Sequence, residues 1–184
     1  MMIRNFAKPI LLGVVVAAAG VVHGADNSKP YFGGDADVAF AKSLWQSMSA
    51  YQLVGTNAIN VYPFTGNQPH GAIQQVTDSA IGVHGRMGRV IVKRNHGGEG
   101  ADVKSVYSDP DKHLKAVTVM FKREAGYDTE NLDWFWAKYT PAGEIDKNPK
   151  GAFLAGRVGK GGSAGCIACH KALGGKDLET LTAR

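Results

Sequence analysis

Hydrophobic positions along the chain follow two different periods. Between residues 35 and 51, apolar side chains recur at three- and four-residue steps, which predicts an amphipathic helix capped by Asp35 or Asp37. From Thr56 onward, short segments rich in β-branched and aromatic residues alternate with Gly, Pro and Asn, a pattern typical of strands separated by turns. The predicted strands are residues 70–76, 89–94, 116–123 and 134–139. The pattern favours an α+β fold, mainly an antiparallel β-sheet with flanking helices.

A C-terminal helix is predicted over residues 164–173, with Gly174-Gly175 ending it. It carries Cys166-Ile167-Ala168-Cys169-His170, and a C-x-x-C-H run is the sequence signature of covalent haem c attachment. Two thiols one helical turn apart reach the two vinyl groups on one porphyrin edge, and the following histidine falls under the iron as an axial ligand. The sequence therefore predicts that Cys166, Cys169 and His170 bind one haem c, with His170 as the metal ligand.

Two other kinds of site use a C-x-x-C pair. A structural zinc site needs four ligands, and the sequence contains no second cysteine pair. A thioredoxin-like redox pair normally follows a strand in a βαβ unit, whereas the lead-in here is the glycine-rich segment 159–163. Both alternatives fit the sequence less well than haem attachment does.

The N-terminal segment predicts export. Residues 1–9 carry Arg4 and Lys8 and no acid, and the apolar run of residues 10–22 is short for a membrane span. Small residues before Ala25 offer a cleavage site, so residues 1–24 are predicted to be a signal peptide, with an uncleaved anchor as the alternative. Export predicts a periplasmic location, which agrees with haem c attachment outside the inner membrane.

Residues 25–184 are long enough for a single c-type haem domain and too short for two domains. Removing Arg4 and Lys8 with the signal peptide lowers the formal net charge from +5 to +3, and two haem propionates bring it near neutral. No basic run with interleaved aromatic residues is present, so no nucleic-acid partner is predicted.

The late position of the haem motif narrows the class of cytochrome. Small electron-transfer cytochromes c carry the motif early and a ligating methionine much later, but the residues after His170 contain no methionine. Helical cytochromes c′ place the motif at the C-terminus, yet they are four-helix bundles, and the middle of this chain has the pattern of strands. We therefore expect the haem to lie against one face of a sheet.

Five segments in order resemble the cytochrome P-460 and cytochrome c′-beta superfamily, over nearly the whole of residues 25–184. They are Gln68-Pro69-His70-Gly71, Gly88-Arg89-Val90-Ile91-Val92-Lys93, Met120-Phe121-Lys122, Trp134-Phe135-Trp136-Ala137-Lys138-Tyr139 and Gly165-Cys166-Ile167-Ala168-Cys169-His170. The resemblance implies a sheet-rich periplasmic homodimer. It also implies a haem iron with histidine on one side and an open or water-bound site on the other.

The two branches of that family imply different functions. Cytochrome P-460 oxidises hydroxylamine, to nitrous oxide or nitric oxide, passes electrons to a partner cytochrome, and has a lysine bonded to the porphyrin edge. The c′-beta branch keeps a more apolar distal pocket and binds nitric oxide or carbon monoxide without turnover. By resemblance the crosslinking lysine is Lys93, whereas the residue pattern alone is equally consistent with a solvent-facing strand lysine.

The distal residues depart from the hydroxylamine-oxidising pattern. Alignment on Lys122 and Trp134 puts Thr118 where that branch has a carboxylate, and Gln74 stands where it has an arginine. Neither side chain takes up protons near neutral pH, although both form hydrogen bonds to a bound ligand or water. Turnover is then expected to be weak or absent unless Glu99, Asp102 or a loop histidine substitutes.

Other residues are candidates for the same pocket. If a histidine or Met120 were the sixth iron ligand, the protein would be a simple electron carrier. A lone histidine in a turn-rich region is more often a surface or packing residue, however, and Met120 is more simply explained as a core residue. The histidines are His70, His84, His96 and His113. An apolar wall around the porphyrin is predicted from Phe64, Phe121, Phe135 and Trp136.

Overall fold

The computed structural model describes residues 30–173 and residue 178. Its centre is one six-stranded sheet in which the strands are neighbours in sequence order and every pair is antiparallel. The strands are β1 (Phe64–Thr65), β2 (Ile73–Val83), β3 (Arg86–His96), β4 (Leu114–Lys122), β5 (Trp134–Tyr139) and β6 (Ala155–Gly156). The predicted α+β class with a mainly antiparallel sheet is confirmed.

The described helices are short, apart from the first. They are α1 (Asp35–Ala50), α2 (Val103–Ser108), α3 (Pro110–His113), the 3-10 helix η1 (Thr129–Asn131) and α4 (Cys166–Ala172). The N-terminal helix expected over residues 35–51 is present and ends one residue earlier, and α4 covers residues 166–172 of the segment 164–173 that was predicted to form the haem-attachment helix. The predicted signal peptide and the Gly174-Gly175 stop lie outside the described residues.

The strand predictions located the strands better than their ends. The strand at residues 134–139 is confirmed to the residue, and β3 is longer than the predicted segment 89–94 at both ends. The prediction for residues 70–76 is wrong at its start, because residues 70–72 belong to a loop and β2 runs from Ile73 to Val83. β2 and β3 form one hairpin, in which Val83 pairs with Arg86 across the two-residue turn His84-Gly85. Both turn residues have positive φ, +49° and +76°, the conformation of the tight turns that match the natural twist of paired strands. Pairing through this turn extends both strands beyond the segments that composition alone marks.

One face of the sheet packs against α1. Alternate residues of β3, β4 and β5 point to this face, and they join the apolar side of α1 in the larger hydrophobic core. Phe40 of α1 contacts Phe135 at 4.7 Å between ring centroids and Phe121 at 5.8 Å. The hydroxyl of Tyr139 donates to the carbonyl of Ala41 at 2.8 Å, which ties the last long strand to the helix.

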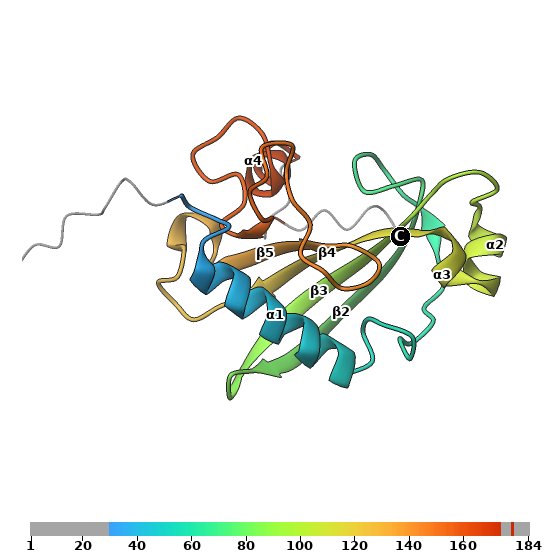
Figure 1. Cartoon of the computed structure of the whole chain (residues 1–184), viewed down its shortest axis with the longest axis horizontal. Helices are drawn as coiled ribbons and strands as arrows, with labels where there is room; N and C mark the ends of the chain where they lie inside the picture. Colours follow the sequence, from blue (N-terminus) through green and yellow to red (C-terminus); the bar gives the residue numbers. More distant parts are fainter. Residues whose placement is uncertain (1–29, 174–177, 179–184) are drawn as a thin grey trace, which may run out of the picture.

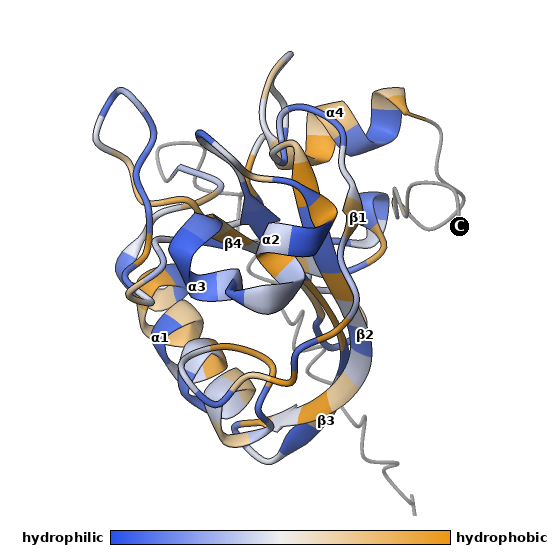
Figure 2. Cartoon of the chain, turned by 90° about the vertical axis from the view of Figure 1, so that its right-hand side faces the viewer, coloured by the Kyte–Doolittle hydropathy of each residue, from blue (hydrophilic) through white to orange (hydrophobic). Residues whose placement is uncertain are grey.

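The other face of the sheet carries a second, smaller core under α4. Its buried members include Ile91, Met120 and Trp136 from the sheet and Ile167 from α4. Figure 1 shows α1 along one side of the sheet and α4 over the other. α4 contains both hydrophobic and hydrophilic residues (Figure 2), as expected of a helix that packs on one side only.

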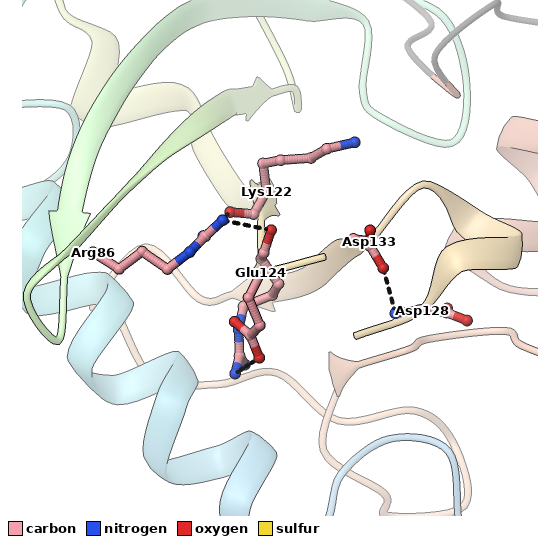
Figure 3. Close-up of polar contacts among 6 residues, drawn as sticks. Arg86, Lys122, Glu124, Asp128 and Asp133 are labelled. Carbon is pink, nitrogen blue, oxygen red and sulfur yellow. Dashed lines mark hydrogen bonds and ion pairs between the residues drawn. The ribbon is translucent and has the colours of Figure 1, made fainter. Parts of the chain in front are cut away.

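A buried carboxylate anchors the loop that leads into α4. Asp128 accepts hydrogen bonds from Lys160 Nζ and, at 2.6 Å, from Asn131 Nδ2. Its backbone N–H donates to the carboxylate of Asp133 at 2.7 Å (Figure 3). Lys160 also lies 3.3 Å from Glu130, so η1 and the glycine-rich segment before Cys166 are held together by charge. Among the described residues, no helix is both long enough and apolar enough to cross a lipid bilayer.

Candidate functional site

The site is built on one row of residues that crosses the sheet under α4. Lys93 of β3 pairs with Val76 of β2 and with Thr118 of β4, and Thr118 pairs with Lys138 of β5. Directly paired residues project to the same face of a sheet, so these four side chains share the face that α4 covers. Lys93 is only 5% exposed, which contradicts the alternative that it is a solvent-facing lysine.

Thr118 is the centre of a hydrogen-bond network in this row. Its Oγ1 accepts from Asn95 Nδ2 at 3.1 Å and lies 3.3 Å from Nδ1 of His70. Gln74 Nε2 donates to the carbonyl of His70 at 3.4 Å, and the N–H of His70 donates to the carbonyl of Asn67 at 3.0 Å. The predicted residues Gln74 and Thr118 thus both contact His70, one at its backbone carbonyl and the other at its ring, and both hold it in place.

Gly71 allows this placement of His70. Its φ is +95°, and a Cβ added there would lie 2.7 Å from the carbonyl oxygen of His96. A side chain at this position would therefore both strain the backbone and push the loop off the end of β3. Glycine lets residues 70 and 71 turn inward against the sheet before β2 begins at Ile73.

His170 enters the site from α4. It is 4% exposed, and its Nδ1 is hydrogen-bonded to the carbonyl of Leu178. A carbonyl acceptor on Nδ1 fixes the tautomer that leaves Nε2 as a lone-pair donor, the arrangement commonly found in metal-binding histidines. The ring lies 4.7 Å from the ring of Trp136 and 6.0 Å from that of His70, measured between centroids.

Three adjoining spaces separate α4 from the sheet and the loop before β2. The largest is about 530 Å³ and is bounded by α4, Thr118, Lys138 and Val158. A second space, of about 270 Å³, is lined by Gln74, Lys93 and Leu173. A small third space is lined by Met120 and Trp136. His70 and His170 line all three. The two imidazoles therefore lie where the three spaces adjoin one another.

The two cysteines differ in exposure. Cys166 is half-buried and Cys169 exposed, both thiols are free, and both line the largest space. Burial raises the pKa of the Cys166 thiol to about 11, so it is a neutral thiol at pH 7. The described residues contain no group of three or more His, Cys, Asp or Glu arranged to hold a metal ion.

Burial keeps the imidazoles of the site neutral. Burial, with the nearby Lys93 charge as the next cause, lowers the pKa of His70 to about 4. Burial likewise lowers the pKa of His170, with the Leu178 carbonyl opposing it. Both rings are therefore neutral nitrogen donors at pH 7, the form in which imidazole binds a metal or accepts a hydrogen bond.

Several predicted members of the site lie elsewhere. Phe121 and Phe135 project to the opposite face of the sheet, into the core under α1, so their assignment to the porphyrin wall is wrong. Trp136 and Met120 do line the site, and Phe64 pairs with Gln74 at the sheet edge. The register explains the error, because residues 135 and 136 necessarily point to opposite faces.

The carboxylates considered as substitutes are also elsewhere. Asp102 accepts from the backbone N–H of Ser105 as the N-terminal cap of α2, and Glu99 is exposed in the preceding loop. Neither lines the three spaces described above. Of the other histidines, His84 forms the exposed β2–β3 turn, whereas His96 and His113 are buried away from these spaces.

Asn95 is a site residue that sequence reasoning missed, and His70 was named there only as one of four histidines that could serve as a sixth ligand. The general expectation that a loop histidine is a surface or packing residue is wrong for His70, which lines the site. The signal in the sequence was the Gln68-Pro69-His70-Gly71 turn, because proline and glycine on either side of one histidine fix its direction. Asn95 was detectable only from the register, which places it two residues from Lys93 on the same face.

Comparison of the chain with protein-family models, with curated proteins and with solved structures finds no match in any of the three.

Proposed function

We propose that Cys166, Cys169 and His170 bind one haem c between α4 and the sheet, and that the protein is a P-460-type cytochrome that oxidises hydroxylamine. The observation that carries the proposal is the position of Lys93. It is a buried lysine in the row of strand residues facing α4, and it shares the 270 Å³ space with Cys169 and His170. A lysine that bonds to the porphyrin edge has to reach the space beside the attachment motif, as Lys93 does.

The residues present fit a haem group. The largest space falls within the range of about 300–1,000 Å³ typical of cofactor and ligand pockets. Its lining combines two free thiols at the attachment spacing, one buried imidazole with its Nδ1 already engaged, and apolar side chains such as Leu154 and Val158. A haem supplies an iron that exchanges electrons and binds a small nitrogen ligand.

The side chains of the sheet define the surroundings of that ligand. Thr118 and His70 supply hydrogen-bonding groups, and Gln74 orients the loop that carries His70. Ile91, Met120 and Trp136 form the apolar wall that restricts water and lowers the local dielectric. Lys138, held at 2.8 Å by Asp146, lies at the edge of the same space, where a positive charge favours an acidic substituent of the porphyrin.

The experiment that tests the proposal is a mass and spectral analysis of the haem-loaded protein. The expected result is a peptide in which haem is bonded to Lys93 as well as to Cys166 and Cys169, a red-shifted Soret band, and loss of both features in Lys93→Arg. Lys138→Arg is the matched control, because it changes the lysine two strands along the same row. Haem bonded only to the cysteines in the wild type would refute hydroxylamine oxidation of the P-460 type.

The second candidate function is capture of nitric oxide or carbon monoxide without turnover, as in the c′-beta branch. It is favoured by Thr118, because the row opposite Lys93 offers a hydroxyl where hydroxylamine oxidation uses a carboxylate. Steady-state assays separate the two functions. Hydroxylamine-dependent reduction of an acceptor cytochrome supports the enzyme, and stoichiometric binding with no reduction supports the gas-binding protein.

The proposal also includes the location and the partners of the protein. The protein would be exported to the periplasm with residues 1–24 removed, act as a homodimer, and pass electrons to an acceptor cytochrome. These assignments rest on the sequence of the N-terminal segment and on the resemblance to the P-460 and c′-beta superfamily.

A further inference from the structure

A separate cavity lies on the face of the sheet opposite the haem site. Its volume is about 290 Å³, at the lower end of the range for small-molecule pockets. It is bounded by α1, the loop after α1, α3, the start of β4 and the turn after β5. Its lining includes Trp45, Val54, Arg94, Asp111 and Val117. A ligand of this cavity must be small.

Arg94 supplies a buried positive charge at this cavity. It lies on β3 between Gln75 and Val117, is 6% exposed, and donates from Nη2 to the carbonyl of Ile59 at 2.7 Å. Burial lowers its pKa, with the carboxylate of Asp111 opposing the effect. A guanidinium has more donors than one carbonyl can satisfy, and its planar fork suits a carboxylate. Its burial beside an open volume favours an anionic group in that volume.

Asp111 supplies the opposite charge at the rim. It belongs to α3, a hydrophilic element in Figure 2, and it is exposed. A simple anion entering the cavity would gain from Arg94 but would be repelled by Asp111. A ligand with a negative and a positive group would gain from both side chains.

The remaining walls are apolar and firmly held. Val54 and Val117 are 2% and 1% exposed. The indole of Trp45 packs against the turn after β5, where a Cβ added to Gly143 would lie only 2.3 Å from the ring. That turn is closed by hydrogen bonds between Thr140 and Glu144. The apolar surface is therefore formed before any ligand arrives, so little ordering free energy is lost on binding.

We propose that this cavity binds a small apolar α-amino acid as its zwitterion. The carboxylate pairs with Arg94, the ammonium group faces Asp111, and the side chain lies against Trp45, Val54 and Val117. This site is independent of the haem proposal, because the sheet separates the two.

The test is calorimetric titration of the full-length, haem-loaded protein with L-leucine. Isovalerate, which has the same apolar part and only the carboxylate, and isoamylamine, which has only the ammonium group, are the comparison ligands. The expected result is saturable leucine binding at least about tenfold tighter than either comparison ligand, the difference that one charge-assisted hydrogen bond provides. Absence of saturable leucine binding overturns the proposal.

Asp111→Asn is the decisive variant, because Asp111 is exposed and its removal leaves Arg94 with its Ile59 bond. It should weaken leucine binding about tenfold while isovalerate binds as well as before or better. Glu99→Asn is the matched control, since it removes an exposed carboxylate that does not line the cavity. Unchanged leucine affinity in Asp111→Asn, or equal weakening of leucine and isovalerate, contradicts the assignment.

Discussion

His70 and His170 face each other across the candidate site, with their ring centroids 6.0 Å apart and their planes at 88°. One comes from a loop before β2 and the other from the C-terminal helix, 100 residues later. The hydrogen bond of His170 is made by Nδ1 to Leu178, and Nδ1 of His70 lies beside Thr118. Each ring therefore has an Nε2 that is not used by these partners. His70 is therefore placed either to hydrogen-bond a ligand of the proposed haem or to occupy the ligand position itself, and the two roles predict opposite effects of removing it.

We expect His70→Ala to weaken hydroxylamine binding to the haem-loaded protein about tenfold, because the bound ligand loses a hydrogen-bonding partner. The affinity is measured by optical titration of the ferric protein. His84→Ala, in the exposed β2–β3 turn, is the control and should retain wild-type affinity. Tighter or faster ligand binding in His70→Ala would instead make His70 a sixth ligand that competes for the iron, and would favour simple electron carriage.

Thr118→Val should destabilise the fold. Asn95 is 5% exposed and donates to the Thr118 hydroxyl, so valine leaves a buried amide without this acceptor. The free energy of unfolding should fall by about 1–3 kcal/mol, measured by urea denaturation. Thr118→Ser keeps the hydroxyl and should retain most of the stability. Equal losses in the two variants would show that the methyl group, rather than the hydrogen bond, matters.

Thr118→Glu should raise hydroxylamine turnover. It places a carboxylate opposite Lys93 and next to His70, at the position where the hydroxylamine-oxidising branch has a carboxylate and this chain has a hydroxyl. A positioned general base contributes about 10²–10⁴ in rate, so a gain of at least tenfold in turnover of an acceptor cytochrome is expected. Thr118→Gln has the same shape without the acid and should show no gain. A similar rate in both variants would exclude proton uptake at this position as the limiting factor.

Lys160→Met should loosen the segment that leads into α4. The side chain of Asp128 is fully buried, and removing Lys160 leaves its charge with a hydrogen bond from Asn131 but without its ion-pair partner. Breaking a buried pair on one side costs about 3 kcal/mol, which thermal or urea unfolding would detect. Lys104→Met, at an exposed position of α2, is the control. A stability equal to that of the control would mean that the pair adds nothing measurable.

Stability should fall as the pH drops below 6.5, in part because of His96. Burial lowers the pKa of His96 from 6.5 to about 4. Between these values the unfolded chain binds a proton that the folded chain does not, so acid favours unfolding; above pH 6.5 the full stability is present. His96→Gln should therefore show a shallower fall in unfolding free energy between pH 6.5 and 4. An unchanged slope would assign the acid sensitivity to other groups.

The sequence by itself determined most of the local elements and the spacing of the C-x-x-C-H motif on which the haem proposal rests. Apolar periodicity located α1, and β-branched and aromatic segments between turn residues located β2 to β5. The spacing of Cys166, Cys169 and His170 depends only on one helical turn, so it too is a local property. Lys93 was predicted as a site residue only from the resemblance, since nothing in the local sequence distinguishes it from the neighbouring Arg89 and Arg94.

Only the tertiary structure decided which side chains share a face and which loop reaches them. Strand alternation assigns Lys93 and Thr118 to the site and Arg94 to the opposite cavity, and a shift by one residue would exchange them. The same alternation places Phe121 and Phe135 on the opposite face of the sheet from the predicted porphyrin wall. His70 reaches the site through the fold of a loop and a contact with β4, 48 residues later in the chain. Such long-range contacts depend on the packing of the whole sheet, which no local pattern contains.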